Sequence, residues 1–195
     1  MFNVLLDKLP WEWRGHPVDM NFEIGIQVSQ CLTDEDLEET ERVSTALGLM
    51  FPEGADLNAN SAVEALAWYL NGWNCEKRPK GEKKDEVTVM DFDVDQWRIY
   101  AAFRTKYGIN LNKSKLHFWE FMGLLSNLDE CAFTQVVSIR SKKVTSKMSK
   151  EEKQAIMKAK ETFRISKKSE PIETAEERAE TDAALEAFNR MRSKS

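Results

Sequence analysis

The sequence predicts a mainly α-helical fold, in which a helical domain carries a small N-terminal β-hairpin and a C-terminal helical appendage. Helix-start signals recur along the chain, and apolar residues recur at helical spacing between them. Only one short segment near the N-terminus has the alternation and turn residues of paired strands. With 195 residues, 42% of them hydrophobic and 31% charged, the chain is long and apolar enough for one folded domain with a charged surface.

The predicted hairpin begins with Leu5, Leu6 and Leu9. Trp11 and Trp13 alternate with a polar residue, Arg14-Gly15 supplies a turn, and the chain returns through Val18 and Met20. The next segment, residues 22–28, has apolar residues that alternate as in a strand but also recur at helical spacing. We interpret it as a helix.

Five positions combine a capping oxygen with an acid or amide three residues later, which is the pattern of a helix N-terminus. The five capping residues are Thr33, Ser61, Asp93, Ser149 and Thr174. In the helix expected from Ser61, the inward stripe consists of Val63, Leu66, Ala67, Leu70 and Trp73.

The densest core is expected in a pair of helices. The first runs from Asp93 to Tyr107, carries Trp97 and Phe103, and ends at Gly108. The second begins at Ser114. Its apolar stripe consists of Phe118, Phe121, Met122, Leu125 and Leu128. A short segment with Phe133, Val136, Val137 and Ile139 covers this pair.

The chain changes character after Arg140. Residues 141–148 are basic and rich in serine, the helix from Ser149 has only a thin apolar stripe, and a linker precedes a charged helix over 174–191. We therefore expect a helical body with its hairpin in residues 1–140. Residues 141–195 form a basic helix, a linker and a charged C-terminal helix.

Charge is distributed unevenly along the chain. Residues 1–76 hold 14 acidic and 3 basic side chains, whereas residues 140–168 hold 11 lysines and arginines. Such polarity is typical of a partner surface or of pairing between the two halves, although it also fits two solvated faces.

The residue patterns argue against an enzyme, a metal site and a bound cofactor. The three cysteines lie at least 44 residues apart, which fits reduced thiols in a cytoplasm. The two histidines, His16 and His117, have no accompanying nucleophile motif. Residues 91–95 resemble the beginning of a calcium loop, but Gln96 and Ala102 occupy the positions that need Gly and Glu. The longest apolar stretches are only a few residues and the N-terminal segment carries Asp7 and Lys8, so we expect neither a membrane-spanning helix nor a signal peptide.

Binding to another protein is the function that these residues favour. Large aromatics are dense in residues 97–121, and although most should be core, Trp and Tyr are also favoured at interfaces. Nucleic-acid binding is disfavoured, because the basic segment has a single ring, Phe163, for base stacking. The candidate partner-binding residues are Trp97, Tyr100, Tyr107, Trp119, Arg140, Lys142, Lys143, Leu185, Phe188 and Met191.

Several strings of residues resemble a family of tailed-phage proteins. They are residues 95–103, the Tyr-Gly-Ile-Asn-Leu string at 107–111, the His-x-Trp-x-Phe string at 117–121 and residues 124–130. The family is typical of long-tailed phages and prophages of Gram-positive bacteria, and it resembles tail assembly chaperones encoded next to the tape-measure protein. The similarity covers about residues 5 to 165; residues 47–60 and 75–86 depart from it.

The resemblance implies a non-catalytic factor that binds the tape-measure protein and coats it during tail assembly. It also implies recruitment of the tail tube protein and absence from the mature virion. We expect action in the host cell cytoplasm, and, because the charge polarity suits head-to-tail contacts between neighbouring copies, self-association in many copies. Two alternatives remain open: a structural head or tail completion protein of the virion, and a nucleic-acid-binding regulator.

Overall fold

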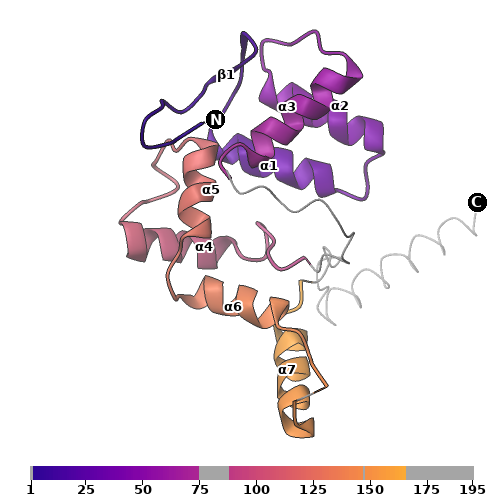
Figure 1. The fold of residues 1–195 in the computed structure, drawn as a ribbon, viewed down its shortest axis with the longest axis vertical. Helices are drawn as coiled ribbons and strands as arrows, with labels where there is room; N and C mark the ends of the chain where they lie inside the picture. The colour runs from indigo at the N-terminus through magenta and orange to yellow at the C-terminus, as the bar shows by residue number, and fades with distance from the viewer. Residues whose placement is uncertain (1, 75–87, 147, 166–195) are drawn as a thin grey trace, which may run out of the picture. The chain divides into compact units, whose positions relative to one another are not determined.

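A computed structural model describes residues 2–74, 88–146 and 148–165 of the chain. The chain divides into two compact units, Met1–Phe163 and Arg164–Ser195, and every element described below belongs to the first. Figure 1 shows that this unit is mainly helical with one small hairpin, as predicted. The division expected at residue 140 stays a prediction, and the helix expected over 174–191 lies outside the described residues.

The hairpin consists of β1 (Glu12–Trp13) and β2 (His16–Pro17), which pair antiparallel with Trp13 opposite His16. Arg14 and Gly15 both have positive φ, 49° and 83°, which is the conformation that a tight two-residue hairpin turn requires. The predicted Arg14-Gly15 turn is therefore confirmed. Arg14 also pairs with Glu64 at 2.7 Å, which joins the turn to a later helix.

Three helices follow, namely α1 (Phe22–Thr33), α2 (Glu39–Met50) and α3 (Ala59–Asn71). The helical interpretation of residues 22–28 is confirmed, and α1 packs against α2 and α5. Gly25 permits the approach to α5, because a Cβ atom there would lie 2.0 Å from the Phe118 ring. Val28 is fully buried between these neighbours, so α1 is a central element of the core.

The second half contains α4 (Gln96–Ala102), the π-helix η1 (Phe103–Tyr107), α5 (Phe118–Ser126), α6 (Ala132–Ser141) and α7 (Lys150–Thr162). Gly108 ends η1 with φ of 70°, as its position in the sequence predicts. The Phe121 ring stacks on Phe22 of α1 and on Phe103 of η1, each at 5.1 Å between centroids. The expected packing of the two helical segments around Phe121 is thus confirmed.

Four helix-start predictions need correction. Asn58 rather than Ser61 caps α3, because its Oδ1 accepts the Ser61 N–H at 2.9 Å. Asp95 rather than Asp93 precedes α4, and α5 begins after His117 rather than at Ser114. Thr33 ends α1, since its hydroxyl donates to carbonyls of the preceding turn. Only the start at Ser149 is confirmed within the described residues, with the Ser149 and Glu152 side chains accepting each other's backbone N–H.

Two predicted core faces are also wrong. In α3 the buried residues are Ala62, Ala65, Leu66 and Tyr69, whereas Val63 is 65% exposed. In α4 the buried residues are Ile99 and Ala102, whereas Trp97 is 72% exposed. In both helices, packing against the rest of the fold turns inward a different face from the one that the apolar residues alone indicate. The large ring of Trp97 consequently faces solvent.

Candidate functional site

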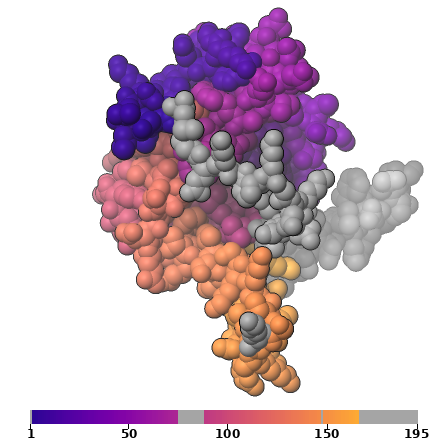
Figure 2. Space-filling view, viewed as in Figure 1, coloured from indigo at the N-terminus to yellow at the C-terminus, as the bar shows by residue number. Residues whose placement is uncertain are grey.

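The N-terminal loop, residues 2–11, presents three consecutive exposed aliphatic side chains, and two of them, Leu5 and Leu6, are the most exposed large aliphatic residues in the described part of the chain. Val4, Leu5 and Leu6 are 63%, 87% and 82% exposed. We call these three residues the apolar tip. Figure 2 shows the indigo N-terminal segment at the surface. Exposed apolar side chains that adjoin one another are typical of protein–protein contacts.

The apolar tip is held by a tight turn. Leu6 and Asp7 donate their backbone N–H groups to the Asn3 carbonyl, at 2.9 and 2.8 Å. The side chains close the same turn, because Asp7 Oδ2 accepts the Asn3 N–H and Asn3 Oδ1 accepts the Leu5 N–H. The tip is therefore ordered before any partner binds, which lowers the entropic cost of binding.

Aromatic side chains anchor both ends of the loop to α5. At one end the Phe2 ring meets Trp119 edge-on at 5.2 Å; at the other, Trp11 meets His117 edge-on at 5.2 Å. His117 and Trp119 lie 5.8 Å apart, so the four rings form a continuous row. Trp11 remains 50% exposed and adds an aromatic surface to the region.

Trp119 is the fixed member of this row. Its indole N–H donates to the Tyr69 carbonyl at 2.8 Å, and the side chain packs edge-on against Trp68. Gly72 makes room for it, because a Cβ atom there would lie 2.1 Å from the indole ring. The loop is thereby tied to α3 as well as to α5.

His117 uses both ring nitrogens for structure. Its Nδ1 accepts the Trp119 backbone N–H at 3.1 Å, which caps α5, so the ring proton lies on Nε2 and is donated to the Pro10 carbonyl at 2.8 Å. Burial lowers the pKa of His117, although the bond to Pro10 and the nearby Glu120 act in the opposite direction. The imidazole is accordingly a neutral link between the loop and α5.

A second surface feature is a groove of about 450 Å³ between α1 and α4, which we call the α1–α4 groove. Buried rings and aliphatics form its floor, whereas polar side chains of α1 stand along its edge. Trp97 lies at the exposed rim and meets Tyr100 edge-on at 5.8 Å. The groove brings together two of the predicted partner-binding residues.

Two other predicted partner-binding residues are buried, which corrects the expectation that they contact a partner. Trp119 is 3% exposed and Arg140 is 5% exposed. Arg140 instead donates to Asp95, to the Val89 carbonyl and to the Phe163 carbonyl. Both side chains hold the fold together rather than face a ligand.

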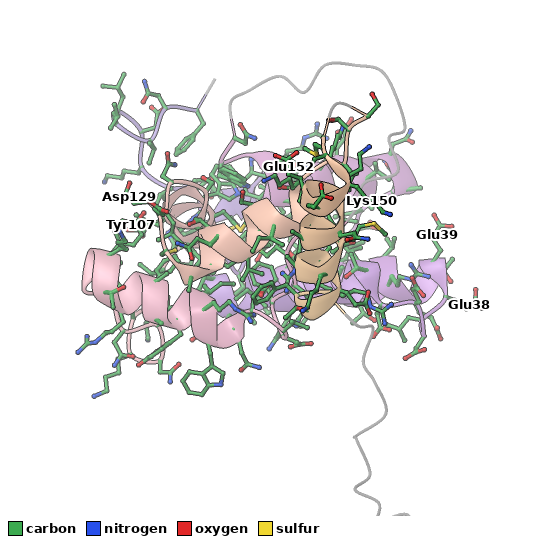
Figure 3. All side chains as sticks on the ribbon, turned by 90° about the horizontal axis from the view of Figure 1, so that it is seen from below. Glu38, Glu39, Tyr107, Asp129, Lys150 and Glu152 are labelled. Atoms are coloured by element: carbon green, nitrogen blue, oxygen red, sulfur yellow. The ribbon has the colours of Figure 1, made fainter. Side chains whose placement is uncertain are left out.

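The remaining predicted residues divide into three groups. Tyr107 is partly buried and donates to the Leu124 carbonyl at 2.9 Å; burial, then the nearby Asp129, raises its pKa (Figure 3). Lys142 and Lys143 are exposed just after α6. Leu185, Phe188 and Met191 lie outside the described residues, so these three assignments stay predictions.

Sequence reasoning missed the apolar tip. It assigned Leu5 and Leu6 to the first arm of the hairpin, whereas they project from a separate turn that precedes β1. The available signal was the Asn3 and Asp7 pair, since such side chains close turns by accepting nearby backbone N–H groups. Three consecutive aliphatic residues inside such a turn cannot all face inward.

No group of three or more His, Cys, Asp or Glu residues suited to a metal ion occurs within the described ranges. None of the helices in that part of the chain has the length and apolar content that a membrane crossing needs.

The family model described as Bacteriophage Gp15 protein matches residues 5–165. Since this match covers most of the chain, the chain belongs to that bacteriophage protein family. No curated protein matches the chain, and no solved structure does.

Proposed function

We propose that this member of the Bacteriophage Gp15 protein family is a tail assembly chaperone, which binds the tape-measure protein and assists assembly of the tail tube without catalysis. The observation that carries the proposal is the apolar tip, because Leu5 and Leu6 are exposed to 87% and 82% on an ordered turn. A chaperone needs apolar surface that is accessible before its client arrives.

The anchoring of the loop supports this role. Phe2 and Trp11 fix its two ends on the rings of α5, so the tip and the exposed part of Trp11 form a preorganised surface. A long helical client offers repeated apolar stripes, and many small proteins with such a surface can cover it. The proposal places this action in the host cell cytoplasm, with the protein absent from the finished virion.

A pull-down tests the proposal. The tape-measure protein and the tail tube protein of the same phage are coexpressed with the tagged chain, and the complex is isolated on the tag. The proposal predicts that the tape-measure protein is recovered in the soluble bound fraction and that tail tube protein is recruited to it. Recovery of no tape-measure protein would contradict the proposal.

Mass spectrometry of purified virions separates this role from the structural alternative. The chaperone role predicts that the chain is absent from mature particles but present in lysates during assembly. Its presence in mature particles at a fixed copy number would instead identify a head or tail completion protein.

A further inference from the structure

We propose that the α1–α4 groove binds helix α7 of a second copy of this chain, so that copies associate head to tail. The inference goes beyond the proposed function, because it concerns contacts between copies and needs no tape-measure protein. It rests on the shape of the groove, its charge and the unburied faces of α7.

The groove has an apolar floor with an aromatic rim. Phe22, Ile99 and Phe121 line its floor and are 5%, 3% and 0% exposed. Trp97 stands at the rim with 72% of its surface exposed. One apolar side chain of a helix can enter a groove of about 450 Å³, with neighbouring residues on the rim.

The charged residues that line the groove are acidic. Glu23 and Asp93 lie on it, and its lining contains no lysine or arginine. Gln30 donates to Asp93 at 2.8 Å, which holds this carboxylate beside α1. Gln30 lies seven positions after Glu23, which corresponds to roughly 10 Å along α1. Because Asp93 is bonded to Gln30, the two carboxylates of the groove are separated by about this distance.

Helix α7 has the complementary character. None of its residues is buried, and Met157 is 63% exposed. Lys150, Met157 and Lys158 are exposed and stand at positions i, i+7 and i+8, which places them within an arc of about 100° around the helix. The helix holds four lysines and three glutamates, and the glutamates lie at its ends, so the stretch 153–160 contains three lysines and no acid. Figure 3 shows Lys150 at the beginning of α7.

The two surfaces fit each other in charge and scale. Met157 can fill the apolar groove while Lys150 and Lys158, about 12 Å apart along α7, lie near the carboxylates. A lysine ammonium beside the Trp97 ring gains a cation–π contact. Charge also favours α7 over residues 170–195 as the segment that binds the groove. Residues 170–195 contain more acids than bases, so Glu23 and Asp93 would repel them.

The contact is heterologous, since the groove of one copy meets the helix of the next. In its own chain α7 packs against α6, and the Arg140 guanidinium donates to the carbonyl of Phe163 just after α7. Each copy can therefore contact one neighbour through its α1–α4 groove and another through the exposed face of its α7. Such an arrangement extends into a chain of copies unless it closes into a ring.

Two variants of the full chain test the proposal. Glu23→Lys/Gln27→Lys makes the groove basic, and Lys150→Glu/Lys158→Glu makes the helix acidic; all four side chains are exposed, and circular dichroism confirms folding. Sedimentation velocity is measured from about 1 to 100 μM at low salt. The wild type should associate with concentration, and each variant alone should associate at least roughly tenfold more weakly.

Mixing the two variants gives the decisive result. The basic groove of one variant fits the acidic helix of the other, and the two unaltered surfaces also fit, so an equimolar mixture should recover the association of the wild type. Lys142→Glu/Lys143→Glu has the same net charge as the helix variant and should associate as the wild type does. Failure of the mixture to associate would overturn the proposal.

A peptide competition experiment with the wild-type protein is an independent test. A synthetic peptide of residues 149–163 in excess should dissociate the wild-type oligomers, whereas the same peptide with Lys150 and Lys158 replaced by Glu should not. Wild-type protein that stays monomeric throughout this range, or oligomers that resist the peptide, would contradict the assignment of α7 to the groove.

Discussion

The guanidinium of Arg140 and the carboxylate of Asp95 form an ion pair at 2.5 Å, with the two side chains 5% and 0% exposed. Asp95 immediately precedes α4 and Arg140 lies near the end of α6, so this pair joins two helices. Arg98 approaches the other carboxylate oxygen at 2.8 Å. The cluster therefore connects α4, α6 and, through the Phe163 carbonyl, the residue that follows α7.

Replacing Arg140 by alanine should destabilise the fold by about 3 to 5 kcal/mol, because it leaves the buried Asp95 carboxylate without its main partner. The variant also loses the donors to the Val89 and Phe163 carbonyls. Urea unfolding followed by circular dichroism measures the change.

Arg98→Ala is the matched control. Its side chain is one-third exposed, so solvent screens the pair with Asp95, and the loss should be about 1 kcal/mol or less. Equal effects of the two substitutions would show that Arg140 is not the principal partner of Asp95.

Stability should fall as the pH is lowered below about 6.5. Burial lowers the pKa of His117 in the folded chain, so the unfolded chain binds the proton more readily. The neutral His117 ring contributes fully to the free energy of unfolding at pH values above the pKa of histidine in the unfolded chain. This contribution is lost as the pH falls from that pKa toward the lower pKa of His117 in the folded chain. Protonation also removes the Nδ1 acceptor that caps α5.

His117→Asn isolates this effect, because an asparagine oxygen can still accept the Trp119 N–H but does not titrate. Thermal unfolding between about pH 7.5 and 5 should show a steeper loss of stability in the wild type than in the variant. Parallel curves would rule out His117 as the source, since His16 is present in both chains.

Phe121→Ala should cost about 3 to 5 kcal/mol through a cavity, because the ring is fully buried between Phe22 and Phe103. Trp97→Ala should change stability by no more than about 0.5 kcal/mol, since its ring is 72% exposed. This reverses the expectation from sequence that Trp97 is core. Denaturant unfolding of both variants measures the contrast, and a large loss for Trp97→Ala would contradict it.

Gly25→Ala should destabilise the contact of α1 with α5, because the added Cβ atom would lie 2.0 Å from the buried Phe118 ring. Displacing that ring should cost about 1 to 3 kcal/mol. Gly48→Ala is the control, since nothing lies within 4 Å of the corresponding position in α2. A variant at Gly25 as stable as the control would mean that Phe118 adjusts without cost.

Local chemistry predicted several elements of this fold. The Arg14-Gly15 turn, the stop at Gly108 and the reciprocal cap at Ser149 depend on a few neighbouring residues. The stripe through Phe118, Phe121 and Leu125 remained visible although α5 begins later than expected. Such features survive errors in boundaries because their spacing alone defines them.

Other features required the tertiary structure. A capping oxygen three residues before an acid also occurs where no helix begins, as at Thr33, whose hydroxyl bonds back into α1. The α1–α4 groove combines Glu23 with Trp97, which are far apart in the sequence, so no local pattern could predict it. Arg140 looked like a surface cation because its partner Asp95 is far away in the sequence, just before α4.

The most direct test of the proposed chaperone function is the solubility of the tape-measure protein on coexpression with Leu5→Ser/Leu6→Ser. Val63→Ser/Val144→Ser is the matched control, because it also replaces two aliphatic residues, 65% and 44% exposed, that lie outside the N-terminal loop. Circular dichroism establishes that both variants fold. The tip variant should leave most of the tape-measure protein insoluble, whereas the control should keep it soluble. Full solubility with the tip variant would contradict the proposed chaperone function.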